Sequence, residues 1–368
     1  MHTKALISFV LFAFLFLLPA GAFAQQPPQQ EILKAEVTKI VTEGEIIPPY
    51  GKTQQYQTVQ ITLLDGNDKG KTITIDHGKM TTLREQEKVT LGEKIVVAKM
   101  STPGGTQYQI VDKYRLDTLL PILFIFFALI LAMSRLKGLG AILGLFISLG
   151  VILLFIVPQI LAGHDPVVIS IIGACIIMAT TIYLAHGFSR KTHIALASTA
   201  ISLVLTGLLA ALFVNITKLT GLGSEDAFSL LIGPAETINF RGLLLGGIII
   251  GALGVLDDIT TSLSATVEEI KKANPSYTFM QLARSGLRVG SEHISSLVNT
   301  LVLAYAGAGL PLFLFLVLNP QHFPVWAILN SELMMEEIVR TITGSFGLVL
   351  AVPLTTLLSA WIVSRKKK

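Results

Sequence analysis

Two adjacent carboxylates within a long apolar stretch are the residues best placed to do chemistry. Asp257 and Asp258 follow a run of glycine and aliphatic residues that begins after Arg241. In a helix, this run would place them about 24 Å along its axis. Charged groups are costly inside a membrane and are usually kept there for a function. The two acids therefore indicate a proton or cation site. The alternative is that they have reached the lipid headgroups and only cap the helix end.

Polar residues also recur at helical spacing in the next apolar stretch. They lie on one helical face or directly beside it: Glu292, His293, Ser295, Ser296 and Asn299. Because this stretch enters the membrane where the preceding one leaves it, its polar face should lie at the depth of the two aspartates. We therefore predict one ion- or proton-binding site, formed by Asp257, Asp258, Glu292, His293 and Asn299. Its acids and imidazole suit a divalent cation or a proton relay, although their spacing matches no metal motif.

The same apolar stretches carry spacings typical of helix packing and of ion pairing. Small residues recur at four-residue intervals and would let another helix approach closely: Gly242, Gly246, Gly247, Gly251 and Gly254. Near the last apolar stretch, Glu336 and Arg340 stand at i and i+4. This spacing predicts an intrahelical ion pair that would reduce the cost of an arginine in the membrane.

The composition is that of a membrane protein. Hydrophobic residues make up 52% of the 368 residues and charged residues 14%, against about 25% charged residues in a soluble domain. The mean hydropathy is +0.67. The apolar stretches are about as long as a bilayer crossing requires. We predict seven spans, at about 118–134, 139–161, 166–187, 194–217, 241–263, 294–318 and 339–363. The single cysteine, Cys175, falls within a span, which excludes a disulfide and predicts a buried thiol.

The distribution of basic residues predicts the orientation of these spans. Twelve Lys and Arg residues fall on one side of the predicted membrane and two on the other, Lys218 and Arg241. By the positive-inside rule the basic tail at 364–368 is cytoplasmic, and seven crossings then place the N-terminal region outside. Residues 1–24 read independently as a signal peptide ending in Ala22-Phe23-Ala24, or as an uncleaved anchor, followed by a polar linker at 25–30.

Residues 31–112 have the pattern of a small β domain. Val59, Ile61 and Leu63 alternate with polar residues, and such alternation is typical of strands with one buried face. Turn sequences separate five or six short strands, which predicts a small all-β barrel or sandwich of OB-like type. The domain has no cluster of His, Cys or acidic residues, and a spacer or docking role is expected.

Three segments of the apolar region have long and distinctive sequences. They are Gly-Ala-Leu-Gly-Val-Leu-Asp-Asp-Ile-Thr at 251–260, Asn-Thr-Leu-Val-Leu-Ala-Tyr-Ala-Gly-Ala-Gly-Leu-Pro-Leu at 299–312, and Arg-Thr-Ile-Thr-Gly-Ser-Phe-Gly-Leu-Val-Leu-Ala-Val-Pro-Leu-Thr at 340–355. These segments resemble the YibE/F family of bacterial multi-pass membrane proteins, and the resemblance covers about 118–363. It implies that Asp258 corresponds to the aspartate of the first motif. Family members often have Arg-Asp where this chain has Ser291 and Glu292, so the acid is kept and the arginine is not. The family is defined without an established activity.

Two classes of function follow from these features. The intramembrane carboxylates favour a transporter or permease component of the bacterial cytoplasmic membrane, with its site on the fifth and sixth spans. The outer β domain and the lack of visible inverted repeats favour a non-transporting sensor or envelope assembly factor. No sequence motif of a hydrolase, metalloprotease or P-loop is present, so neither an enzyme nor a cofactor is expected. Expected partners are the lipid bilayer, a cation or small solute, and an envelope protein or a second copy of the chain. Nucleic acid is not expected.

Overall fold

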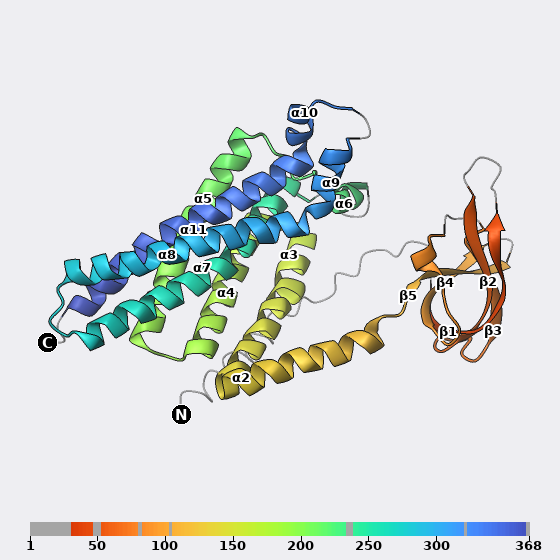
Figure 1. Cartoon of the computed structure of the whole chain (residues 1–368), viewed down its shortest axis with the longest axis horizontal. Helices are drawn as coiled ribbons and strands as arrows, with labels where there is room; N and C mark the ends of the chain where they lie inside the picture. Colours follow the sequence, from red (N-terminus) through yellow and green to blue (C-terminus); the bar gives the residue numbers. More distant parts are fainter. Residues whose placement is uncertain are drawn as a thin grey trace. The chain divides into compact units, whose positions relative to one another are not determined.

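The chain divides into two compact units, each of which is described by itself. The computed structural model describes residues 31–46, 53–79, 83–102, 105–232, 238–319 and 322–365. One unit ends at Leu129 and contains all the strands, and the other begins at Ile130 and is helical (Figure 1). The predicted signal peptide at 1–24, the linker at 25–30 and most of the basic tail lie outside the described residues.

The N-terminal unit is an antiparallel half-barrel of five strands, as the alternating pattern predicts. The strands are β1 (Glu31–Ile46), β2 (Gln54–Leu63), β3 (Thr72–His77), β4 (Lys94–Thr102) and β5 (Gly105–Lys113), with a 3-10 turn η1 (Glu85–Glu87) before β4. Their order in the sheet is β3-β2-β1-β4-β5. The sheet curls strongly (Figure 1), so its edge strands β3 and β5 approach each other. The prediction of a small all-β domain is confirmed, with β5 ending one residue beyond the predicted boundary.

The register of β1 explains how one sheet closes its own core. Ala35 pairs with Leu63 of β2 on one side and with Ile95 of β4 on the other. All three side chains are buried, since their relative exposures are between 0% and 1%. Two irregularities in β1, after Val37 and after Ile40, bend the strand. Such bulges increase the local twist, which allows a 16-residue strand to follow the curve of the half-barrel.

The second unit is a bundle of long apolar helices. The first helix, α2 (Leu116–Val151), begins in the N-terminal unit and enters the second unit at Ile130. The elements that follow are the π-helical turn η2 (Ile152–Ile156), α3 (Val157–Leu161), α4 (Pro166–His186), α5 (Arg190–Ile216), α6 (Glu225–Ile232), α7 (Phe240–Ala273), α8 (Phe279–Ala308), α9 (Leu310–Leu318), α10 (Val325–Leu329) and α11 (Glu332–Ser364). A break at Arg135, where φ is 51°, divides α2 into two spans.

The described helices include six to seven that could span a membrane, against the seven spans that the sequence predicts. Among the described residues, six helices are long and apolar enough to cross a membrane. A seventh span is formed if α8 and α9, which are bent by 66° at Gly309, count as one. The chain is therefore a polytopic membrane protein with six to seven apolar spans, and its apolar surface is suited to contact with a lipid bilayer.

Helix α7 lies at the centre of the bundle and packs against α4, α5, α8 and α11 (Figure 1). A side chain at Gly246 would collide with Ser170 of α4. A side chain at Gly242 would come within 2.9 Å of Asn239, the N-cap of α7, and within 3.2 Å of Pro166 of α4. Among the described residues, a side chain at Gly247 or Gly254 would meet nothing within 4 Å, and one at Gly251 would meet only the hydroxyl of Tyr305. The close approach of a neighbouring helix is thus confined to the face of α7 that carries Gly242 and Gly246.

Candidate functional site

The two predicted aspartates lie in different environments on α7. One carboxylate oxygen of Asp257, Oδ1, is buried and has no hydrogen-bond partner among the described residues. Asp258 is exposed and lies within electrostatic range of His186 at the end of α4. Neighbouring residues on a helix point about 100° apart, which explains why one acid turns inward and the other outward. Asp257 is therefore the stronger candidate for a buried binding group.

A small cavity between α4, α5 and α7 lies one helical turn from Asp258 along α7. It has a volume of about 280 Å³ and is lined by His186, Lys191, Thr192, Ala195, Thr261, Ser262 and Ala265. Ser262 is one turn beyond Asp258 on α7, so the acid stands near the edge of this cavity. The bases that accompany the aspartates thus come from the ends of α4 and α5, and the predicted α8 residues are not among the lining.

A seam of buried hydroxyl groups runs along the contacts of α5, α7 and α11. We call these side chains the hydroxyl seam: Ser198, Thr199, Ser202, Thr206, Thr260, Ser264, Thr343, Thr355, Thr356 and Ser359, all at most 1% exposed. The hydroxyls of Thr199 and Thr260 lie 2.5 Å apart and join α5 to α7. Six of the ten have no hydrogen-bond partner among the described residues: Ser198, Ser202, Thr343, Thr355, Thr356 and Ser359. The four-residue spacing of Ser198, Ser202 and Thr206 is the sequence signal that could have identified this seam.

The predicted site residues on α8 lie on the side of that helix opposite to its contact with α7 and α11. Helix α8 packs through its glycines, with Gly286 against Val267 and Thr356, and Gly290 against Leu263 and Val352. Glu292 and Asn299 are exposed, and His293 is half-buried. The antiparallel contact of Gly290 with Leu263 brings Ser296 level with Asp257 along the two helices. The predicted grouping of Glu292, His293 and Asn299 with Asp257 and Asp258 is wrong, because the glycine face of α8 is the packed face.

The predicted outer ion pair forms with a different glutamate. Arg340 lies 3.6 Å from Glu337, at i and i+3. Glu336 is 5% exposed and accepts a hydrogen bond of 3.0 Å from the backbone N–H of Gly223. Glu332 likewise accepts bonds from the N–H groups of Thr220 and Gly221, at 2.6 and 3.0 Å. The predicted pair Glu336–Arg340 is therefore wrong, because Arg340 pairs with Glu337 and the N–H of Gly223, in the loop after α5, binds Glu336.

Within the described ranges, no three His, Cys, Asp or Glu side chains come together in a way that could hold a metal ion. Cys175 is exposed on α4, where a buried thiol was expected. The apolar span around it is packed on its other face, so the prediction gave the right helix and the wrong side. A divalent metal centre receives no support from this geometry.

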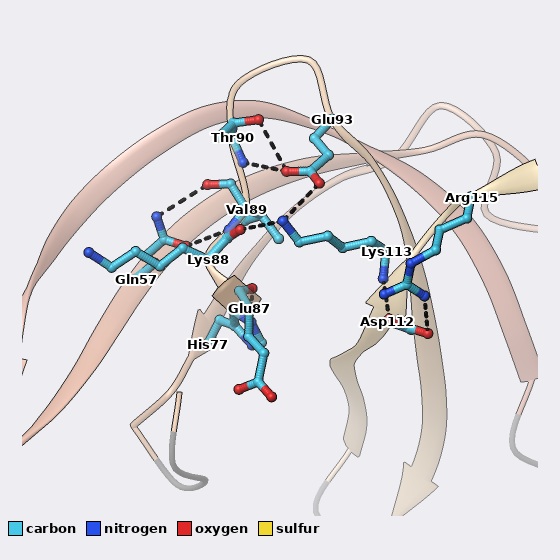
Figure 2. A network of polar contacts seen from close by, with 10 residues as sticks. All are labelled: Gln57, His77, Glu87, Lys88, Val89, Thr90, Glu93, Asp112, Lys113 and Arg115. Atoms are coloured by element: carbon cyan, nitrogen blue, oxygen red, sulfur yellow. Dashed lines mark hydrogen bonds and ion pairs between the residues drawn. The ribbon is translucent and has the colours of Figure 1, made fainter. Parts of the chain in front are cut away.

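The half-barrel contains a second candidate site, a cavity lined by residues of β3, η1, β4 and β5. The cavity has a volume of about 470 Å³ and its lining includes His77, Glu87, Val89, Lys113 and Arg115. Figure 2 shows the polar network at its wall. Lys113 donates to the carbonyl of Lys88 at 2.7 Å and pairs with Glu93 at 3.0 Å. The basic groups Lys113 and Arg115 are thus paired with acids of the same domain, Glu93 and Asp112.

The protonation of this network follows from its hydrogen bonds. Burial alone would raise the pKa of Glu93, but bonds from Thr90 and Lys113 outweigh it and hold that pKa below its ordinary value. The side-chain bond from Arg115 similarly lowers the pKa of Asp112. The Nε2 atom of His77 lies 3.3 Å from the carbonyl oxygen of Glu87. Glu93 and Asp112 are therefore ionised at neutral pH. The hydrogen bonds from Thr90 to Glu93 and from Lys113 to Lys88 hold the segment between η1 and β4.

Bundle and half-barrel together define a class, that of a polytopic membrane protein with an N-terminal β domain. Comparison of the sequence with protein families identifies the group more closely. The family model described as YibE/F-like protein matches residues 122–365. The chain therefore belongs to the YibE/F-like family, and the resemblance of its three long motifs is confirmed. No curated protein matches the chain, and no solved structure does.

Proposed function

We propose that this protein is a membrane transport component in which Asp257 binds a proton or a monovalent cation during transport. The observation that supports this proposal is the buried Asp257 Oδ1 atom, which has no hydrogen-bond partner among the described residues of a membrane-spanning helix. An unpaired carboxylate is costly in such a position, whereas a carboxylate that takes up a proton or a cation is not. The proposed site lies on α7 and α5, and α8 contributes no ligand.

The hydroxyl seam gives this acid a polar surrounding at the right depth. Thr199 of α5 contacts Thr260, which is three residues beyond Asp257 on α7. Ser198 and Ser202 also lie on α5, and their hydroxyls have no hydrogen-bond partner among the described residues. A hydroxyl can both donate and accept, so a row of them can solvate a small cation or conduct a proton. The cavity beside Asp258 would then form the inner approach to the site.

The test is ion flux in liposomes that contain the purified protein. Asp257→Asn keeps the shape of the side chain and removes its charge, and we expect it to reduce flux driven by a pH gradient at least tenfold. Asp226→Asn is the matched control, because Asp226 is an exposed aspartate on α6. Both variants should insert and melt like the parent protein. Equal flux in the two variants, or the lack of any gradient-driven flux in the parent, would refute the proposal.

We also propose an orientation, with the half-barrel outside the bacterial cytoplasmic membrane and the C-terminus in the cytoplasm. The basis is the excess of Lys and Arg in one set of short loops. This arrangement would give the half-barrel access to envelope components.

The alternative function is that of a non-transporting sensor or assembly factor, and the cavity of the half-barrel favours it. At about 470 Å³ it is large enough for a small ligand. If this alternative holds, substitution of the cavity residue Met100 by Trp should abolish function in cells while Asp257→Asn leaves it intact.

A further inference from the structure

Helix α8 carries a polar face that no part of the described bundle covers. We call Glu292, Ser295, Ser296 and Asn299 the α8 polar stripe, and all four are exposed. The side chain of Asn299 has no hydrogen bond to any other described residue. The packed face of the helix, with Gly286 and Gly290, lies on the other side. The stripe therefore needs a partner from outside this bundle.

The depth of Asn299 makes its exposure costly. The contacts of α8 with α7 fix the register, since Gly290 lies against Leu263 and Tyr305 against Gly251. Asn299 falls between these two contacts and is level with about Gly254, within the apolar part of α7. A polar side chain at such a depth would face hydrocarbon in an isolated copy. Membrane proteins instead place such groups against another helix, where they form hydrogen bonds.

The stripe is complementary to itself. An asparagine amide and a serine hydroxyl each donate and accept, so each can bond to the same residue of an identical helix. Arg288 and Glu292 are both exposed, stand one turn apart, and have no ion pair with any described residue. Two copies related by an axis along the membrane normal present parallel α8 helices. In that arrangement Glu292 lies beside the partner's Arg288, and the reverse pair forms as well.

We propose that the α8 polar stripe is the contact between two copies of this chain in the membrane. The recurrence of polar residues at 288, 292, 295 and 299 is the three- and four-residue spacing of a parallel helix pair. In such a pair the two Asn299 side chains, one from each copy, and two exchanged ion pairs would hold the helices together, and the stripe would face the other copy instead of lipid. This contact is independent of Asp257, because Asp257 belongs to α7, which packs against the opposite face of α8 through Gly286 and Gly290.

The first experiment uses crosslinking of the full-length protein in native membranes. Cys175 is exposed and must be replaced by Ala. In that background Asn299→Cys should form dimers with a short thiol crosslinker. Val204→Cys is the matched control, because Val204 is 61% exposed at a similar depth on α5. We expect the control to remain monomeric. Equal crosslinking at the two positions, or no crosslink at 299, would overturn the proposal.

A charge exchange tests the same contact without relying on one position. Arg288→Glu and Glu292→Arg should each lower the yield of the crosslink at 299 severalfold, and the double variant should restore it. Single-molecule photobleaching in vesicles gives the strength of the contact, and Asn299→Leu should raise the dissociation constant about three- to twentyfold. A parent protein that bleaches in one step would refute the proposal. So would a monomeric Asn299→Cys protein that reacts with a membrane-impermeant maleimide, because the stripe would then line water.

Discussion

For Gln57 of the half-barrel, the loss of stability on substitution can be worked out from the structure. Its side chain is 2% exposed. It accepts a bond of 2.9 Å from the N–H of Val89 and donates one of 3.2 Å to the carbonyl of the same residue. A third bond, of 3.1 Å, reaches Glu43. One side chain thus satisfies both backbone groups of a buried residue that links η1 to β4 (Figure 2).

In Gln57→Leu both backbone groups of Val89 lose their partners. A buried unsatisfied donor or acceptor costs about 1–3 kcal/mol, and the added apolar surface of leucine recovers part of this cost. We expect the free energy of unfolding to fall by about 3 kcal/mol, a large share of the stability of a small domain. With a urea dependence of about 1.5 kcal/mol per molar, the unfolding midpoint should fall by about 2 M.

The assay is urea unfolding of residues 31–115 followed by circular dichroism. This fragment has its own core, in which Val37, Val59 and Ile95 are fully buried, so we expect it to fold alone. Gln107→Leu is the control, because Gln107 is exposed on the edge strand β5 and its loss should change stability by at most about 0.5 kcal/mol. A midpoint for Gln57→Leu within about 0.3 M of that control would refute the reasoning, and a disordered fragment would refute independent folding.

Three further predictions test the half-barrel, the bundle and the orientation. Because the pKa of Glu93 is lowered in the folded state, its contribution to stability is present above about pH 4.5 and is lost as the pH falls through the folded-state pKa. Acid titration of the fragment should show this loss of stability, and in Glu93→Gln the stability should depend less on pH. A side chain at 246 would collide with Ser170, whereas one at 247 would meet no described residue within 4 Å. Gly246→Val should therefore destabilise the bundle by about 1–3 kcal/mol, and Gly247→Val should melt at the same temperature as the parent protein. Reporters fused after Arg190 and inserted near Gly223 should read cytoplasmic and extracytoplasmic, and the opposite readings at both sites would overturn the orientation.

The sequence predicts the elements of this protein well because their signals are local. The alternation around Ile61 identifies a strand without knowledge of its neighbours, and β2 covers that segment. Apolar length identifies the spans in the same way, and the structure agrees to within a few residues for most of them. Only α7, α8 and α11 extend well beyond the predicted ends, because their polar continuations are still helical. Helix continuation depends on packing outside the apolar run, which hydropathy does not report.

The sequence predicts the facing of residues less well, because two rules compete on one helix. For α8 the prediction followed the rule that polar residues in a membrane turn toward the bundle. The structure follows the rule that small residues mark the closest contact, through Gly286 and Gly290. For Glu336 the local i,i+4 spacing to Arg340 competed with a donor from Gly223, which is 113 positions away in sequence. No local pattern reveals such a donor. Gln57 was missed for the same reason, since its partner Val89 belongs to a segment without regular periodicity.

The two faces of α8 connect the proposed site with the proposed contact between copies. On its packed face, Gly286 lies against Thr356, a member of the hydroxyl seam. On its exposed face, Asn299 is available to a second copy. A shift of α8 at the dimer contact would therefore change the packing over the seam without moving Asp257 itself. The two proposals still fail separately: loss of flux in Asp257→Asn says nothing about the dimer, and a monomeric Asn299→Leu protein can retain flux. If that monomer transports at the parent rate, the packing of α8 and the ion site are uncoupled. If it folds normally but transports more slowly, the second copy holds α8 in place over the hydroxyl seam.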